Sequence, residues 1–213
     1  MIFADRQEAG VLLGQAVAKR SPLDPLVAAL PRGGVPVGFE VAEALGCDLD
    51  VLVVRKVGVP FQPELAMGAV GEHGVVIRNQ EVMRAARITE QTFEAVVAAE
   101  TAELEARVGI YREVAEPIDS TGRTVIITDD GLATGSTALA GIGVARAGGA
   151  REVWVAVPVA PADSIHRVES AADQVVVLDR PKRFMAVGAW YRDFSQTSND
   201  EVRDLLRRSR HGH

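Results

Sequence analysis

The sequence predicts an α/β fold, namely a mainly parallel, doubly wound sheet with helices on both faces and a small C-terminal hood. Apolar runs such as residues 125–127 show no alternation of apolar and polar side chains, which is typical of parallel strands covered on both faces. These runs alternate along the chain with segments of helical periodicity, as in proteins with parallel sheets. Because 47% of the 213 residues are hydrophobic, the chain can bury one sizeable core, and we expect a single domain over residues 1–213 with the hood at about 180–213.

The predicted strands are short apolar runs bounded by turn residues. They cover residues 26–30, 49–54, 75–78, 125–127, 153–157 and 175–178. The predicted helices follow a 3.6-residue period, and two of them begin with a capping pair, Asp5 with Glu8 and Ser198 with Glu201. These helices cover residues 5–20, 36–45, 89–113, 137–148, 163–170 and 199–208.

The most informative segment joins a predicted strand to a predicted helix. Asp129 and Asp130 follow the strand at 125–127. A loop of small and hydroxyl residues comes next, formed by Ala133, Thr134, Gly135, Ser136 and Thr137. Backbone N–H groups and hydroxyls at a helix N-terminus can surround a phosphate dianion. The two acids would repel that phosphate, so they suit sugar hydroxyls, and the segment predicts a site for a phosphorylated sugar.

A second loop carries a cation beside two glycines. Arg32, Gly33 and Gly34 follow the strand at 26–30, and Pro36 suits the first turn of the next helix. A guanidinium next to residues that lack a Cβ can approach an anion closely, with backbone N–H groups as further donors. Alone this triplet is a turn, but its place in the fold favours a second anion site.

A third loop begins with two adjacent cations, Arg55 and Lys56, after the strand at 49–54. Glycine and proline interrupt the stretch at 58–64 that follows, and we interpret it as a mobile loop with a charged hinge. The alternative for Arg55 and Lys56 is a pair of solvated charges at a strand end.

Residues 125–137 resemble the phosphoribosyl pyrophosphate (PRPP) motif of type I phosphoribosyltransferases, in which a hydrophobic strand, two acids and an Ala-Thr-Gly-x-Thr-like loop follow one another. The resemblance implies that Asp129 and Asp130 hold the ribose hydroxyls, and that the loop at 133–137 holds the 5′-phosphate. It also implies Mg²⁺ as the cofactor, bound indirectly to the two acids through PRPP and water.

The same resemblance assigns the pyrophosphate of PRPP to the two cationic loops. The loop after the first core strand binds pyrophosphate in that family, which implies this role for Arg32, Gly33 and Gly34. Several members of the family have an Arg-Lys pair that contacts pyrophosphate and stands at the start of a flexible catalytic loop. The resemblance assigns the same role to Arg55 and Lys56. That loop would close over the site, because water would hydrolyse the sugar cation formed during transfer.

The acceptor is less well defined. Ala133 stands where the hypoxanthine-guanine branch has an acid, and so resembles the adenine, uracil and xanthine branches. The aromatic-rich segment at 181–194 is similar to the hood strand of the purine enzymes, which suggests that Phe184 or Trp190 stacks on a base. For each of them, packing of the hood is the alternative. Over nearly the whole chain, the order of motifs most resembles a bacterial group of predicted phosphoribosyltransferases whose acceptor is not settled.

The resemblance therefore implies an enzyme of nucleotide salvage that transfers the phosphoribosyl group of PRPP to a nucleobase or similar nitrogen heterocycle. A PRPP-sensing regulatory protein remains an alternative, as does a hydrolase or phosphorylase of a ribosyl phosphate compound. A Walker A loop is excluded, because Gly131 and Gly135 are too close together and Ser136 stands where Lys is needed. Gly141 and Gly143 lie inside a predicted helix, so close packing explains them better than a dinucleotide site.

Composition bears on partners and compartment. A net charge of -6 argues against a nucleic-acid partner, and no apolar run is long enough to span a membrane. Charged residues appear within the first six positions, at Asp5 and Arg6, and no signal-like core follows, so we expect a cytoplasmic protein, with a homodimer as one possible assembly. Cys47 is interpreted as a small buried hydrophobe. The histidines have no metal-ligand spacing and stand at His73, His166, His211 and His213.

Overall fold

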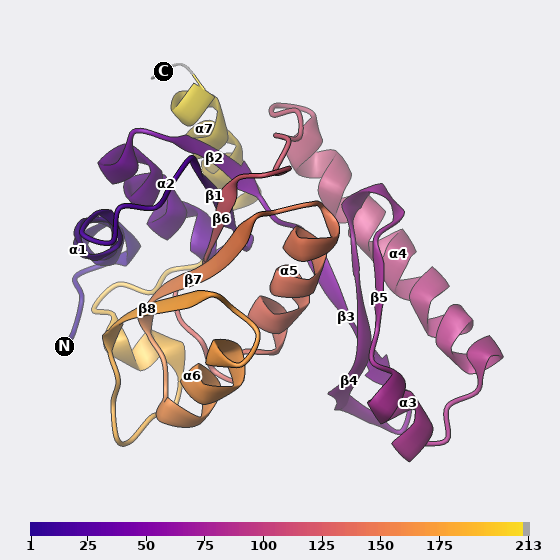
Figure 1. Cartoon of the computed structure of the whole chain (residues 1–213). Coiled ribbons are helices and arrows are strands. Elements are labelled where there is room, and N and C mark those ends of the chain that lie inside the picture. The colour runs from indigo at the N-terminus through magenta and orange to yellow at the C-terminus, as the bar shows by residue number, and fades with distance from the viewer. Residues whose placement is uncertain (211–213) are drawn as a thin grey trace.

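The centre of the molecule is a parallel five-stranded sheet with the strand order β2-β1-β6-β7-β8 (Figure 1). The computed structural model describes residues 1–210, so His211, His213 and the end of the predicted domain lie outside the described residues. The five strands are β1 (Pro25–Ala29), β2 (Asp48–Val51), β6 (Thr124–Thr128), β7 (Glu152–Val159) and β8 (Gln174–Asp179). The predicted parallel sheet is confirmed.

Helices cover both faces of this sheet (Figure 1). One face carries α1 (Arg6–Ala18), α2 (Gly34–Leu45) and α7 (Asn199–Arg210), and the other carries α5 (Ser136–Ala147) and α6 (Ala162–Glu169). Within β6, Ile126 packs into the hydrophobic cluster that includes residues of α1, α2 and α7. Val125 and Ile127 pack into the cluster that includes residues of α5 and α6. A strand buried on both faces needs apolar residues at every position, which explains the unbroken apolar run.

A separate antiparallel sheet lies beside the parallel one and was not predicted. It consists of β3 (Val54–Val59), β4 (Gln62–Gly71) and β5 (Val76–Arg78), with α3 (Gln80–Ala85) and the long α4 (Glu90–Arg112) against it (Figure 1). The predicted strand at 49–54 is wrong in extent, because β2 ends at Val51 and β3 starts a different sheet at Val54. The sequence of β4 does not resemble a typical strand, because it begins with polar residues and proline and then contains small residues.

The stretch at 58–64, interpreted from the sequence as a mobile loop with a charged hinge, forms the turn end of the β3–β4 hairpin. The pairing of the two strands shifts register on both sides of Gly58. A Cβ at Gly58 would lie 2.5 Å from the carbonyl oxygen of Pro63, so only glycine fits this bulge. Arg55 and Lys56 therefore lie inside a strand, opposite Val70 and Ala69, rather than at a strand end.

The start of the chain is held against the C-terminal hood. Phe3 forms a bridge with Tyr191, its N–H donates to the carbonyl of Trp190 at 2.8 Å, and its carbonyl accepts from Arg192 at 2.9 Å. The Asp5 side chain then caps α1 by accepting from the N–H of Glu8 at 2.8 Å. The short helix η2 (Val187–Trp190) belongs to this hood.

Several local predictions hold. Glu201 donates its N–H to the Ser198 hydroxyl at 3.1 Å, which confirms the second capping pair. Cys47 is buried, and burial raises the pKa of its thiol to about 11. A Cβ at Gly141 would lie 3.3 Å from Ile127, so this glycine does serve close helix packing. No helix in the described part of the chain has both the length and the apolar character needed to cross a bilayer.

Candidate functional site

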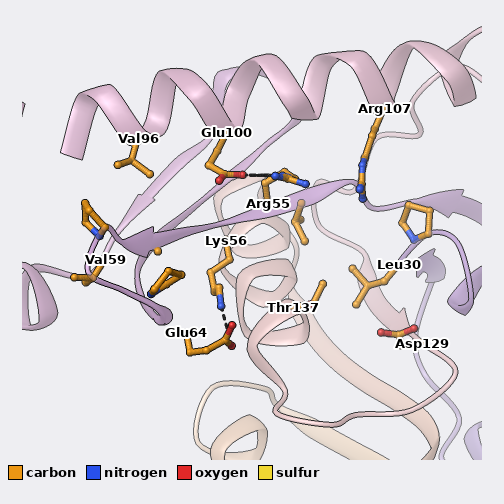
Figure 2. A pocket seen from close by; sticks show the side chains of 15 residues that line it. Leu30, Arg55, Lys56, Val59, Glu64, Val96, Glu100, Arg107, Asp129 and Thr137 are labelled. Atoms are coloured by element: carbon orange, nitrogen blue, oxygen red, sulfur yellow. Dashed lines mark hydrogen bonds and ion pairs between the residues drawn. The ribbon is translucent and has the colours of Figure 1, made fainter. Parts of the chain in front are cut away.

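A cavity of about 630 Å³ opens between the carboxyl ends of β1 and β6, the β3–β4 hairpin and α4 (Figure 2). Two of the three predicted loops contribute predicted site residues to its wall, whereas the segment before Arg32, Gly33 and Gly34 contributes only Leu30 and Pro31. The lining residues are Leu30, Pro31, Val54, Arg55, Lys56, Gly58, Val59, Pro60, Pro63, Glu64, Val96, Glu100, Arg107, Asp129 and Thr137. The carboxyl ends of parallel strands are the usual place for a ligand in this kind of sheet.

A smaller cavity of about 180 Å³ lies under the loop that joins β6 to α5. Its wall consists of Asp129, all residues from 131 to 138, and Val187 of the hood. Gly135 caps α5 with φ of 77°, and the Thr134 hydroxyl donates to the Ser136 hydroxyl at 3.1 Å. Asp129 and Thr137 line both cavities, so the two spaces lie side by side at this loop. Backbone N–H groups at the start of α5 can bind an anion there.

The two acids after β6 lie in different surroundings. Asp129 faces both cavities, and one of its carboxylate oxygens accepts from the N–H of Asp130 at 2.8 Å. Asp130 lines neither cavity and is paired with Arg6, whose Nε lies 2.9 Å from Oδ2 of Asp130. Burial raises the pKa of Asp129 well above its ordinary value, and the neighbouring charge of Asp130 adds to the rise. Burial also raises the pKa of Asp130, and Arg6 offsets part of that rise.

The two predicted cations on β3 are each paired with an acid. Arg55 lies 2.7 Å from Glu100 of α4, and the two side chains are 26% and 25% exposed. Lys56 lies 3.2 Å from Glu64, whose side chain is 85% exposed at the hairpin end (Figure 2). Both pairs can be opened by a stronger anion, because solvent already screens them.

The glycine loop after β1 reaches the cavity with Leu30 and Pro31, whereas the Arg32 side chain is not part of the lining. Arg32 lies near Tyr111 instead. Burial raises the pKa of Tyr111, and Arg32 and Arg107 offset part of this rise. Gly34 packs against β6, since a Cβ there would lie 2.5 Å from the carbonyl oxygen of Thr128.

The sequence did not reveal the contribution of α4. Figure 2 shows Arg107 pointing from α4 into the cavity, on the same side as Val96 and Glu100. Within residues 1–210, no carboxylate forms an ion pair with Arg107. The spacing of four and seven residues places all three side chains on one face of the helix. The periodicity of the predicted helix at 89–113 does not by itself indicate which of its faces adjoins a cavity.

The structure does not bring the two candidate stacking residues to either cavity. Trp190 packs against the cluster of Phe3, Ala9 and Tyr191, and its buried indole N–H has no hydrogen-bond partner among residues 1–210. Phe184 is half-buried in the hood. In this structure Trp190 therefore packs within the hood, which was the alternative to stacking on a base.

A metal ion at this site would need oxygen atoms from a ligand as well as from the protein. Within residues 1–210, no three His, Cys, Asp or Glu side chains are grouped so that they could hold an ion by themselves. Asp129 offers a carboxylate at the junction of the two cavities. Mg²⁺ is commonly bound by one or two carboxylates together with substrate phosphates and water, so Asp129 fits such an ion.

Comparisons with known proteins give a consistent result. The family model described as phosphoribosyl transferase domain matches residues 12–191. A curated relative from Mycobacterium tuberculosis strain H37Rv, named "Putative phosphoribosyl transferase", is 50% identical over 208 residues, which are 98% of this chain and 47% of the relative. The chain thus spans about half the length of the curated relatives it matches.

Solved structures agree in fold. The crystal structure of TT1426 from Thermus thermophilus is 42% identical, with a TM-score of 0.92 over 98% of this chain and 99% of that one. A hypoxanthine-guanine phosphoribosyltransferase from Bacillus anthracis is 11% identical, with a TM-score of 0.51 over 85% of this chain and 83% of that one. At this identity the second likeness concerns the fold alone.

Proposed function

The chain belongs to the phosphoribosyl transferase domain family, and on this basis we propose that it transfers the 5-phosphoribosyl group of PRPP to a nitrogen atom of a nucleobase or similar heterocycle, releasing pyrophosphate. One observation carries the proposal. The acid Asp129 and the hydroxyl loop at Thr137 face the same 630 Å³ cavity as the cations Arg55 and Lys56. A ligand that reaches from one set to the other needs a hydroxylated centre and anionic groups at both ends, and PRPP has this form.

In the proposed pose, the donor extends from the smaller cavity into the adjacent larger one. The 5′-phosphate occupies the smaller cavity, where Thr134, Gly135 and Ser136 surround the start of α5. The ribose lies at the junction beside Asp129, and the pyrophosphate extends into the larger cavity. There it meets Arg55, Lys56 and also Arg107, which extends the set of pyrophosphate contacts inferred from the sequence. In this pose the Arg32 side chain does not contact the donor, and the preceding residue, Pro31, lines the cavity.

The reaction breaks the bond between C1 of the ribose and the pyrophosphate oxygen, which keeps the electron pair. The acceptor nitrogen bonds to C1, which carries positive charge in the transition state, and the proton of the acceptor N–H passes to the departing pyrophosphate or to water. Arg55, Lys56 and Arg107 stabilise the negative charge on the departing pyrophosphate, and bound Mg²⁺ supplies further charge neutralisation. No protein nucleophile is needed. The β3–β4 hairpin forms a wall of the cavity and limits the access of water, which would compete with the acceptor.

The experiment is a turnover assay with PRPP, Mg²⁺ and a panel of purine and pyrimidine bases, following nucleotide and pyrophosphate together. The proposal expects both products in equal amounts with at least one base, and loss of both in Asp129→Asn. Pyrophosphate released without any base would instead favour a hydrolase. Tight PRPP binding without turnover on the whole panel would favour a PRPP-sensing regulator, and no PRPP binding would refute the proposed site.

A further inference from the structure

The second acid of the motif points away from the proposed ligand. Oδ2 of Asp130 accepts a hydrogen bond from Nε of Arg6 at 2.9 Å, and Nη2 of Arg6 lies 2.9 Å from the same oxygen. The two side chains are only 14% and 12% exposed. Solvent therefore screens this pair much less than the pairs of Arg55 and Lys56, and a charge-assisted contact through two nitrogens is correspondingly strong.

The rest of Arg6 is also engaged. Its Nη1 donates to the carbonyl of Ser195 at 2.7 Å, and its guanidinium carbon lies 4.0 Å from the centre of the Phe194 ring. The backbone carbonyl of Asp130 accepts from the Tyr191 hydroxyl at 2.6 Å. Asp130 is thus tied to the first turn of α1 and to the C-terminal segment at once, and any movement toward the cavity would break contacts on both.

The glycine loop closes the other side of the pair. A Cβ on Gly33 would lie 2.1 Å from Oδ2 of Asp130 and 3.4 Å from Nε of Arg6. The Asp130 carboxylate therefore lies directly on the backbone of this loop, in space that only glycine leaves open. Three segments distant in the chain meet here, and all of them fix Asp130 in the orientation that faces away from both cavities.

We propose that Arg6 is a positioning residue that holds Asp130 in a neutral pair, so that Asp129 is the one acid of the motif that contacts the ribose hydroxyls. This inference rests on the proposed function, because the ribose is the ligand. The pairing has a physical advantage. A second uncompensated carboxylate beside Asp129 would repel the phosphates of the donor, and Arg6 removes that repulsion without leaving the acid unpaired.

The test compares two probes by isothermal titration, ribose 5-phosphate and inorganic phosphate. Their ratio of dissociation constants measures how well the sugar is recognised, apart from the phosphate loop. In Asp129→Asn we expect this ratio to fall by about tenfold or more, the usual effect of losing a hydrogen bond to a charged group. In Asp130→Asn we expect it to stay within about threefold of the wild-type value. Arg192→Ala, on an exposed residue of the same C-terminal segment, is the matched control.

Arg6 itself is tested by rescue. Arg6→Ala leaves the charge of Asp130 uncompensated, so both probes should bind more weakly by a similar factor. Adding Asp130→Asn to Arg6→Ala should restore the affinity for inorganic phosphate, which a purely structural role of Arg6 would not produce. If Arg6→Ala does not fold, Arg6→Gln with and without Asp130→Asn serves the same comparison.

Two outcomes would overturn the inference. One is a loss of the affinity ratio in Asp130→Asn as large as in Asp129→Asn, which would mean that both acids contact the sugar. The other is additivity of Arg6→Ala and Asp130→Asn in thermal unfolding, which would mean that the two residues are not coupled. The second readout needs no ligand. If the wild-type protein bound neither ribose 5-phosphate nor PRPP, the proposed function and the proposed contact of Asp129 with the ribose would both be refuted. Thermal unfolding of the Arg6 and Asp130 variants would still show whether these two residues are coupled.

Discussion

The guanidinium of Arg55 on β3 and the carboxylate of Glu100 on α4 form an ion pair at 2.7 Å on the wall of the main cavity. This pair joins the antiparallel sheet to its covering helix (Figure 2). It also occupies one of the cations that the proposed reaction needs for pyrophosphate. Glu100 therefore competes with the pyrophosphate for Arg55, and the pyrophosphate must displace the Glu100 carboxylate to bind this guanidinium.

Removing that competition should strengthen anion binding. In Glu100→Gln, titration with pyrophosphate should give a dissociation constant about two- to fivefold lower than in the wild type, in line with the usual strength of a partly exposed ion pair. Glu103→Gln, an exposed acid on the same helix, is the control and should leave the constant unchanged. Weaker binding in Glu100→Gln would show that Glu100 orients Arg55 rather than competing for it.

Arg107 should contribute to the pyrophosphate end of the donor and not to its phosphate end. Arg107→Ala should raise the KM for PRPP by about tenfold, the usual effect of a lost charged contact, with little change in the affinity for inorganic phosphate. Steady-state kinetics and phosphate titration check the two halves of this statement. Arg84→Ala, which removes an exposed arginine from α3, is the matched control. An equal loss for both ligands would place Arg107 outside the proposed pyrophosphate site.

Arg112 should be essential for stability rather than for binding. It lies 2.6 Å from the buried Asp50 of β2 and 2.8 Å from Glu72, and so connects the end of α4 to the sheets. Arg112→Ala leaves two acids unpaired and should lower the free energy of unfolding by about 3–5 kcal/mol. In a domain of this size, thermal unfolding should shift by roughly 2–4 °C for each kcal/mol. Asp204→Ala, which disrupts an exposed pair with Arg207, should change the stability by less than about 1 kcal/mol.

The raised pKa of Asp129 predicts how stability depends on pH. A carboxyl whose pKa is raised by folding binds its proton more tightly in the folded state. Its contribution is complete below its ordinary pKa and is lost as the pH rises through the raised value. Asp129→Asn removes this loss, so the variant should unfold at a higher temperature than the wild type at pH 7.5, with a smaller difference at pH 5.

The control for the pH dependence is Asp119, whose pKa is lowered by hydrogen bonds with Thr121. A lowered pKa has the opposite sign, so Asp119→Asn should give no gain in thermal stability at pH 7.5. Calorimetry of both variants at the two pH values makes the comparison. If Asp129→Asn were less stable than the wild type at pH 7.5, its carboxylate would be stabilised in the folded protein, contrary to its surroundings.

The order of strands and helices was predictable wherever a single segment carried its own signal. The unbroken apolar run before Asp129 marks a strand that is buried on both faces, and the capping pairs at Asp5 and Ser198 mark helix starts. The loop after β6 was predictable as part of a cavity wall for the same reason, because Asp129 and Thr137 lie close together in the chain. The antiparallel sheet was not, since its longest strand, β4, contains proline, glycine and alanine and shows no clear period, and only the run at 75–78 predicted one of its strands, β5.

The sequence by itself determined the parallel sheet and the residues of the motif after β6, because both depend on neighbours in the chain. Only the tertiary structure decided what those residues face. Arg6 reaches Asp130 across 124 positions and Glu100 reaches Arg55 across 45, so no local pattern could pair them. The direction of Asp130 follows from how α1, the glycine loop and the C-terminal segment pack around it. Two adjacent, identical acids thereby acquire different surroundings, one at the junction of two cavities and one within a neutral pair.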